Sequence, residues 1–447
     1  MQQDLTKGSI TKTMLFFAVP MILGNLLQQF YNIADTLIVG RVLGSEALAA
    51  VGSAYSLMTF LTSILLGLSM GSGTVFSICF GQKNMDKLKS SIFLSFFFIA
   101  IITIVLNLLV FLLIDPILHL LQTPDNIYSM MREYLIVIFF GISATFLYNY
   151  FASLLRAIGN SIVPLVFLAI SALLNVGLDL LFVLVFSFGV KGAAIATVLS
   201  QFVSGIGILC YTFFHFSYLR PEKRHCKWDG GILKEITQFS FLTCIQQSVM
   251  NFGILMVQGL VNSFGATVMA AFTVAVKIDS FAYMPVQDFG NAFSTFIAQN
   301  YGAKQFLRIK KGIRNAIITS TVFCVMISTI VFLFAKSLMM IFVKPEETEI
   351  ISIGVQYLRT EGTFYCGIGC LFLLYGFYRA IQKPGMSVIL TIISLGTRVL
   401  LAYTLSAIPS IGILGIWISV PIGWFLADLV GLLYYLFNPS AKQKLQQ

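Results

Sequence analysis

The sequence carries little charge. Only 10% of its 447 residues are Asp, Glu, Lys or Arg, whereas a soluble domain carries about 25%. Hydrophobic residues make up 58% of the chain, and the mean hydropathy is +0.91. These values exclude an ordinary soluble domain. They predict an all-α polytopic membrane protein.

Paired metal-binding or redox residues are also missing. None of the seven cysteines forms a CxxC pair, so neither a zinc site nor a disulfide framework is indicated. The three histidines, His119, His215 and His225, lie apart at loops or helix ends and are interpreted as ordinary solvated residues. A membrane-embedded enzyme would need a cluster of acid, base or nucleophile, so we expect no enzyme and no catalytic residue. No GxxxxGK[ST] loop occurs, which argues against ATP as the direct energy source. We expect no cofactor beyond a coupling ion.

Long apolar runs dominate the chain instead. Twelve of them are near the ~20 residues that a membrane-spanning helix requires. They lie at 14–39, 46–71, 91–114, 134–154, 162–186, 190–214, 237–263, 267–297, 315–335, 352–377, 386–408 and 411–437. The longest polar interruption, Phe216–Glu235, divides them into two sets of six. The predicted parts are an N-terminus (1–13), an N-lobe (14–215), a linker (216–236), a C-lobe (237–437) and a C-terminus (438–447).

The net charge of +10 follows the predicted topology. Of the 28 Lys and Arg residues, 20 fall in the two termini and the loops on the same side, five fall on the opposite side, and three lie in or near spans. Because cytoplasmic loops are enriched in Lys and Arg, both termini are predicted to be cytoplasmic. The basic residues are expected to meet lipid headgroups rather than nucleic acid. Since residues 1–12 are polar and mixed in charge, we expect no cleavable signal peptide.

The two halves of the chain resemble each other. The stretch Gly44–Ala50 returns as Gly265–Ala271, and Gly81-Gln-Lys returns as Gly302-Ala-Lys, both at an offset of 221 residues. Arg156-Ala-Ile returns as Arg379-Ala-Ile at an offset of 223. Each repeat holds six predicted spans, an even number, so the repeats run parallel about an axis along the membrane normal. Two six-helix repeats around a central cavity are suited to alternating access.

An acidic residue interrupts the first apolar run. An ionised acid such as Asp35 costs about 2.5–3.5 kcal/mol at the middle of a bilayer, so it indicates a functional site. Asn25, Gln28, Asn32 and Asp35 are spaced three, four and three apart, which places them on one helical face. A polar seam between helices is the alternative, but a seam needs amides and hydroxyls rather than an acid. The pattern favours a wall that binds a proton or cation and faces a cavity.

A second acid follows in the fifth run. Ser171, Asn175 and Asp179 are four residues apart and share a face, and Thr197 and Gln201 repeat this spacing in the sixth run. Two nearby carboxylates in a low dielectric cannot easily both ionise. Such a pair can hold one proton, or it can bind a hard cation such as Na⁺ through oxygen atoms.

The C-lobe does not duplicate this acid pair. The positions that match Asp35, Asn175 and Asp179 hold Met256, Arg398 and Ala402. Candidate cavity residues in this half are Gln247, Asn251, Lys277, Asp279 and Arg398. Basic and acidic members occur together, so internal pairing is expected, with Arg398 to Asp428 as one guess.

Pro20 lies six residues into the first run. Its ring removes a backbone hydrogen bond and can kink a helix. Two interpretations stay open: a simple kink near the start of the helix, and a bend that changes as Asp35 gains or loses a proton.

At this point the chain resembles the multidrug and toxic compound extrusion (MATE) family. The motifs are Phe17-Ala-Val-Pro20, Asp35-Thr-Leu-Ile-Val-Gly-Arg-Val-Leu-Gly44, Ala49-Ala-Val-Gly52, Arg156-Ala-Ile-Gly159, Asn175-x-x-x-Asp179 and Gly192-Ala-Ala-x-Ala-Thr197. The resemblance implies two six-helix bundles that open alternately to each side. It also implies a cation site at Asp35, Asn175, Asp179 and Thr197. The lack of an acid in the seventh run makes the chain more similar to the DNA-damage-inducible branch.

We therefore expect an antiporter that exports organic, cationic and amphipathic compounds, driven by H⁺ or Na⁺. A flippase for a lipid-linked or anionic amphiphile is the alternative, and it would need a basic cavity, for which Lys277 and Arg398 are candidates. We expect a multi-pass protein of a bacterial cell membrane that works as a monomer. Its partners are a small-molecule substrate and the lipid bilayer.

Overall fold

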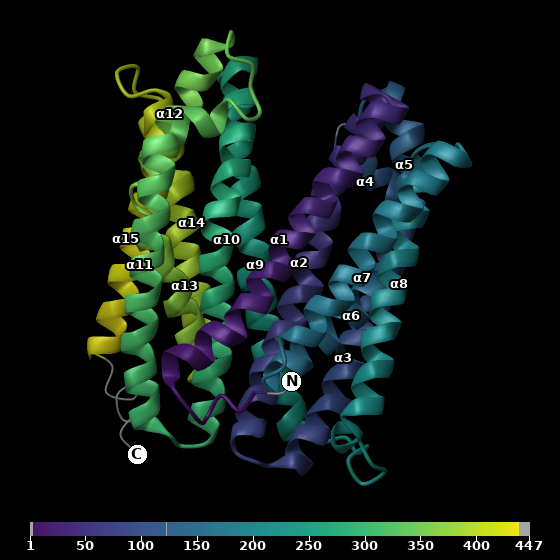
Figure 1. The fold of residues 1–447 in the computed structure, drawn as a ribbon, viewed down its shortest axis with the longest axis vertical. Helices are drawn as coiled ribbons and strands as arrows, with labels where there is room; N and C mark the ends of the chain where they lie inside the picture. The colour runs from purple at the N-terminus through teal and green to yellow at the C-terminus, as the bar shows by residue number, and fades with distance from the viewer. Residues whose placement is uncertain (1–2, 122, 438–447) are drawn as a thin grey trace. The chain divides into compact units, whose positions relative to one another are not determined.

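The computed structural model describes residues 3–121 and 123–437, and every regular element in these ranges is a helix (Figure 1). Ten helices are long and apolar enough to cross a membrane, and α5 with α6, bent by 45°, makes an eleventh candidate. The remaining predicted span, 352–377, corresponds to two consecutive helices, α12 and α13. The prediction of an all-α polytopic membrane protein is confirmed.

The helices of the first half follow one another with short connections. Their bounds are α1 (Ile10–Leu43), α2 (Ser45–Gly81), α3 (Met85–Leu112), α4 (Ile114–Leu120), α5 (Asp125–Phe139), α6 (Gly141–Ala157), α7 (Ile162–Asp179) and α8 (Gly189–His215). A π-helix, η1 (Leu180–Val185), continues α7, and a short 3₁₀ turn (Ser217–Leu219) follows α8.

In the described chain, the second half follows a similar order, without separate helices that correspond to α4 and η1. Its helices are α9 (Gly230–Asn262), α10 (Ala266–Gly302), α11 (Phe306–Met339), α12 (Thr348–Gly362), α13 (Tyr365–Ala380), α14 (Pro384–Ser406) and α15 (Ile413–Phe437). α2 and α10 have the same length, 37 residues, and α1 and α9 have 34 and 33 residues.

Backbone geometry repeats along with the sequence. Four positions with positive φ in the first half have partners in the second half, at the offsets of 221 and 223 seen in the sequence. The pairs are Gly44 (89°) with Gly265 (101°), Lys83 (56°) with Lys304 (56°), Gly159 (86°) with Gln382 (62°), and Gly189 (61°) with Gly412 (52°). Positive φ is uncommon outside glycine, so the shared turn at the two lysines is strong evidence for an internal duplication.

The chain forms two compact units. Among the described residues, the first holds 3–4 and Leu23–Cys244, and the second holds Leu5–Ile22 and 245–437. The division falls inside α1 and inside α9. By contrast, the predicted lobes (14–215 and 237–437) each begin with a complete helix.

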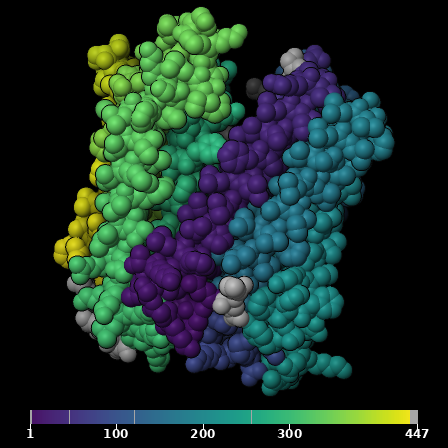
Figure 2. Space-filling view, viewed as in Figure 1, coloured from purple at the N-terminus to yellow at the C-terminus, as the bar shows by residue number. Residues whose placement is uncertain are grey.

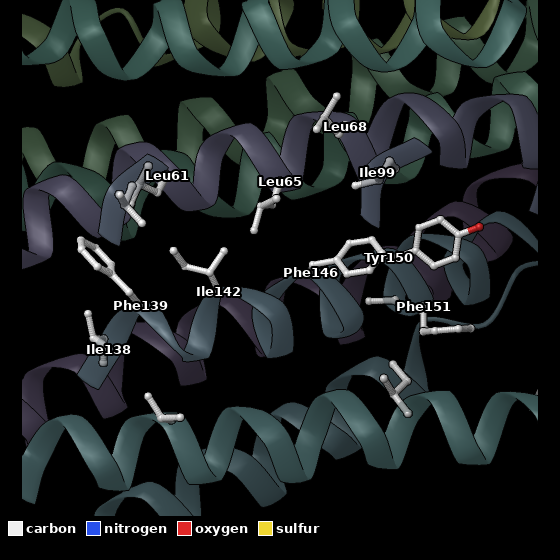
Figure 3. Close-up of a cluster of buried hydrophobic side chains, with 14 of the residues drawn as sticks. Leu61, Leu65, Leu68, Ile99, Ile138, Phe139, Ile142, Phe146, Tyr150 and Phe151 are labelled. Carbon is white, nitrogen blue, oxygen red and sulfur yellow. The ribbon is translucent and has the colours of Figure 1, made fainter. Parts of the chain in front are cut away.

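The core of the first unit is aromatic and aliphatic. Phe146, Tyr150 and Phe151 on α6 lie among side chains of α2 and α3, and Ile138 and Phe139 on α5 extend the cluster (Figure 3). The Tyr150 hydroxyl donates to the carbonyl of Ile92 at 2.7 Å, which satisfies it within the core. Because lipid tails are as apolar as leucine, helices in a membrane associate through such packing and through internal hydrogen bonds.

Small residues bring α2 against the first half of α9 within the first unit. A Cβ added at Gly71 would lie 2.4 Å from Ser240 Cα, and one added at Gly67 would lie 2.5 Å from Cys244 Cα. The hydroxyls of Ser72 and Ser240 are 2.9 Å apart. Close approach through glycine and serine is typical of membrane helix contacts.

The first residues of the chain are fastened within the second unit. Arg308 of α11 donates to the carbonyls of Lys7 and Gly8, both at 2.7 Å. After this segment α1 begins at Ile10, and its side chains form part of the visible surface, in purple (Figure 2). Its exposed side is apolar, with Phe16, Phe30 and Leu37 more than half exposed. Such a side suits contact with lipid tails.

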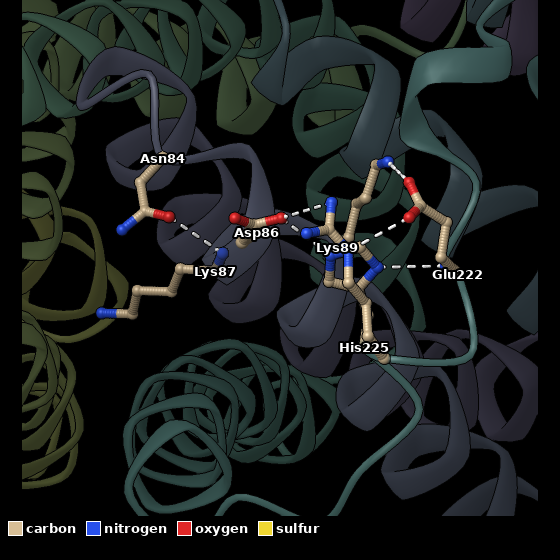
Figure 4. A network of polar contacts seen from close by, with 7 residues as sticks. Asn84, Asp86, Lys87, Lys89, Glu222 and His225 are labelled. Carbon is tan, nitrogen blue, oxygen red and sulfur yellow. Dashed lines mark hydrogen bonds and ion pairs between the residues drawn. The ribbon is translucent and has the colours of Figure 1, made fainter.

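The segment after α8 folds back onto the start of α3 (Figure 4). His225 Nε2 lies 2.9 Å from Asp86 Oδ1, and His225 Nδ1 accepts from the backbone N–H of Glu222 at 3.1 Å. Lys89 Nζ donates to Glu222 Oε1 at 2.6 Å, and this bond holds the pKa of Glu222 below its ordinary value. His225 is only 3% exposed. The prediction that all three histidines are solvated is therefore wrong for His225, because its ring joins two segments far apart in sequence.

Candidate ion-binding site

The candidate site lies in the first unit, where two acidic side chains come from α1 and α7. Asp35 lies in the last third of α1, and Asp179 is the last residue of α7. Directly after Asp179 the chain enters the π-helix η1. π-helical turns are rare and occur frequently at functional sites. The irregular turn thus marks the same position as the acid.

The two carboxyl groups are neighbours. Each lies within electrostatic range of the other. Asp179 is completely buried, and its carboxyl group lies within hydrogen-bonding range of that of Asp35, so the two could share a proton. No N–H or O–H group of the described residues donates to the Asp179 carboxyl oxygens or to Asp35 Oδ1. No Lys or Arg forms an ion pair with either acid in the described part of the chain. Burying such oxygens without partners is costly, so this place favours a proton or a cation.

Further oxygen atoms line the same part of α7 and α8. Asn175, one turn before Asp179 and 2% exposed, donates from Nδ2 to Thr197 Oγ1 at 3.3 Å. Asn175 Oδ1 is buried without a partner. The described residues hold no group of three or more His, Cys, Asp or Glu that could bind a metal. A bound cation would therefore draw on the two carboxylates together with amide and hydroxyl oxygens, which suit a hard ion such as Na⁺.

Three tyrosines that the sequence analysis did not single out complete the site. Tyr31 interacts electrostatically with Asp35, Asp179 and Tyr55, and the buried Tyr134 interacts with both acids. A signal for Tyr31 was present, since it lies one turn before Asp35 on α1. Tyr134 is matched by Tyr357 at the offset of the repeat.

The remaining predicted residues of the first lobe are half-buried and take part in local hydrogen bonds. Ser171 Oγ donates to the carbonyl of Ser200 at 3.0 Å, and Gln201 Oε1 accepts from Thr145 Oγ1 at 3.4 Å. Gln28 contacts Tyr31. Asn25 and Asn32 lie on α1 with Asp35 and are half-buried. Their role in lining a cavity stays a prediction.

Pro20 lies inside α1, which runs unbroken from Ile10 to Leu43. The residue belongs to the part of α1 that packs in the second unit. A proton-dependent bend at this position stays a prediction.

The second unit holds a different charged cluster. Asp279 on α10 and Glu361 on α12 are 5% and 2% exposed, and both interact electrostatically with Arg398 on α14. The Tyr365 hydroxyl donates to Asp279 Oδ1 at 2.6 Å. Glu361 was missed, although a lone acid in the span predicted at 352–377 was a signal of the same kind as Asp35.

Three other predictions concern this unit. The guess that Arg398 pairs with Asp428 is wrong, because Asp428 contacts Cys370 and Arg398 acts on Asp279 and Glu361. Lys277 is exposed, and it lies two positions before Asp279 and so on another side of α10; its role in lining a cavity stays a prediction. On α9, Gln247 is buried and Asn251 is half-buried.

These features define a helical membrane transporter built from two repeats, with buried ionisable groups inside each unit. Comparison with known proteins agrees. The MatE family model matches residues 20–181 and 240–404. The chain is 30% identical over 99% of its length to the probable multidrug resistance protein YpnP of Bacillus subtilis, of which it covers 98%. It is 28% identical over 99% of its length to the probable multidrug resistance protein YoeA of the same organism, of which it covers 96%.

Solved structures show the same fold. A MOP superfamily transporter from Pyrococcus furiosus superposes with a TM-score of 0.92, at 23% identity, over 99% of this chain and 98% of that one. The chain belongs to the MatE family, as the resemblance predicted. It is a membrane transporter and not an enzyme. Its place in the DNA-damage-inducible branch stays a prediction.

Proposed function

We propose that this chain is a secondary antiporter that exports organic, cationic and amphipathic compounds in exchange for H⁺ or Na⁺. One observation carries the proposal: the half-buried Asp35 and the buried Asp179 lie together in the first unit, and three of their buried oxygen atoms receive no hydrogen bond from another described residue. If these two acids had only a structural role, a basic side chain would be expected beside them, because an unpaired buried charge is costly. An exchangeable ion supplies the missing positive charge.

Exchange follows from competition for this negative charge. When the coupling ion binds Asp35, the site loses one negative charge and its attraction for a cationic substrate weakens, so the substrate leaves. When the ion leaves toward the cytoplasm, the negative charge returns and attracts the next cation. Asp179 tunes the affinity of Asp35 for the ion, and Asn175 and Thr197 orient the acids. Alternating access of the two repeats, with both termini in the cytoplasm of a bacterial cell, makes the exchange vectorial.

The proposed substrate class rests on charge and on the relatives. Multidrug resistance and multidrug export are the activities in the names of several similar proteins. A flippase for an anionic amphiphile would need a basic cavity. Arg398 lies with two acids, Asp279 and Glu361, so its surroundings hold more negative than positive groups. The antiporter is therefore favoured.

Transport in proteoliposomes tests the proposal. Vesicles with the full chain receive a fluorescent cationic dye, and a pH gradient or a Na⁺ gradient is imposed separately. We expect one gradient to drive dye movement in the wild type and this driven movement to be lost in Asp35→Asn. Asp125→Asn, an exposed acid at the start of α5, is the matched control and should transport normally. Undiminished driven transport in Asp35→Asn would overturn the assignment, and dye movement indifferent to both gradients would overturn antiport itself.

A further inference from the structure

The charged cluster of the second unit has no role in the exchange described above. Its ionisable members are Asp279, Tyr283, Glu361, Tyr357, Tyr365 and Arg398, contributed by α10, α12, α13 and α14. Asp279 accepts a short hydrogen bond from the Tyr365 hydroxyl, at 2.6 Å. Glu361 Oε1 and Arg398 Nε are buried and have no hydrogen-bond partner.

The internal repeat relates this cluster to the ion site of the first unit. Tyr134 interacts electrostatically with Asp35 and Asp179. Its repeat partner Tyr357 interacts electrostatically with Glu361, Asp279 and Arg398. Asn175 corresponds to Arg398 at the same offset of 223. The two clusters therefore occupy equivalent places in the two units.

The charges of the two clusters are distributed differently. In the first unit both acids come from α1 and α7, and their repeat positions are Met256 and Ala402. In the second unit the acids are Asp279 and Glu361, at positions where the first unit has the apolar Met58 and Ile138. Each cluster has two acids, but only the second has an arginine. The guanidinium cannot lose its proton in a protein.

We propose that Arg398 is a permanently attached cation, which takes the place in the second unit that an exchangeable ion takes in the first. Its charge offsets the buried acids throughout the transport cycle. Ion exchange is thereby confined to the first unit, while the second unit carries a fixed cation. Arg398 acts as a positioning and charge-setting residue, without contact to the substrate.

The consequence is that loss of Arg398 should create a demand for a new ion. Arg398→Gln leaves two buried acids with no base nearby. The variant can restore its charge only by taking up a proton or a metal cation. Its folded state should then be stabilised by acid or by Na⁺ more strongly than that of the wild type.

Thermal unfolding of the purified full-length chain tests this directly. The unfolding temperature is measured from pH 5.5 to 8.5, with Na⁺ or with a bulky organic cation as the salt. We expect Arg398→Gln to lose several degrees at pH 8.5 relative to wild type and to recover most of the loss at pH 5.5 or in high Na⁺. Arg398→Lys keeps the charge and should follow the wild-type pH profile.

A double variant separates charge from packing. Arg398→Gln with Asp279→Asn restores the original balance of one uncompensated acid, so its pH profile should be that of the wild type even if Arg398→Gln alone does not fold. A profile for Arg398→Gln parallel to that of the wild type would overturn the proposal. So would a double variant as unstable as the single one. The readout is the difference in stability between variant and wild type. An ion at Asp35 affects both proteins alike, so this difference does not depend on whether Asp35 couples transport.

Discussion

At the scale of single residues, the bond between Asn175 and Thr197 is the most direct test of the oxygen shell around the acid pair. Asn175 Nδ2 donates to Thr197 Oγ1 and is otherwise enclosed between α7 and α8. In Thr197→Val the shape is retained, but the amide loses its acceptor, and leaving a buried donor unpaired costs about 1–3 kcal/mol. We expect a lower unfolding temperature and weaker gradient-driven dye transport, measured on the same purified protein.

Thr197→Ser is the matched control, since it keeps the hydroxyl and removes only a methyl group. It should retain most of the driven transport. If the serine and valine variants transport equally well, the hydroxyl has no part in holding Asn175, and the oxygen shell must be drawn from other residues.

At the scale of elements, the contact between α2 and α9 depends on the absence of a side chain at Gly71. A Cβ there would lie 2.4 Å from Ser240 Cα and 2.5 Å from the carbonyl oxygen of Phe239, both backbone atoms that cannot rotate away. Gly71→Ala must separate the helices, and overpacking of this kind typically costs about 1–3 kcal/mol. The expected result is a clear fall in the unfolding temperature of the detergent-purified protein.

Gly52 of the same helix provides the comparison, because a Cβ there would have no atom within 4 Å. Gly52→Ala should be neutral or stabilising, by up to about 1 kcal/mol, since alanine favours a helix. If the two substitutions change the unfolding temperature equally, helix propensity, and not the close approach of α2 and α9, determines the stability of these variants.

The helices were largely predictable from hydrophobic runs, but their breaks were not. The spans predicted at 134–154 and 352–377 each consist of two helices, α5 with α6 and α12 with α13. Hydropathy shows how long an apolar run is, but it does not show where the helix within that run is interrupted, as it is at Phe140 and at Phe364. The π-helix after Asp179 was invisible for the same reason. Asp35 and Asp179 were predictable as site residues, because a charged residue inside an apolar run can be recognised without knowing where the helix begins.

Contacts between distant segments were harder to predict. Asp35 and Asp179 were expected to be close because both lie in one half of the chain, and the structure brings them together. Glu361 was missed although it is a lone acid in a predicted span, and Tyr134 was missed because an aromatic residue in an apolar run does not differ locally from a packing residue. His225 has polar sequence neighbours and yet is buried against Asp86. Burial of this kind depends on how a loop packs against a helix, and the hydrophobic periodicity of the sequence does not predict such packing.

At the scale of the whole molecule, the duplication explains both the fold and its asymmetry. Positive φ at Lys83 and Lys304 shows that the two turns share a backbone conformation even where glycine is not used. The charged groups inside the units have diverged, with Asn175 in one and Arg398 in the other. A duplicated scaffold thus leaves each unit free to hold a different set of charged groups.

The orientation of the molecule in the membrane is a separate prediction. The excess of Lys and Arg on one side predicts that the segment between α8 and α9 faces the cytoplasm. This segment contains Cys226, an exposed free thiol. A membrane-impermeant maleimide should label Cys226 in inside-out vesicles and not in intact cells, whereas Cys226→Ser should lose this signal. On that background, Asp125→Cys, placed at the exposed start of α5, should show the opposite pattern, with labelling in intact cells. Labelling of Cys226 from outside the cell would reverse the topology, and with it the direction in which Asp35 takes up its ion.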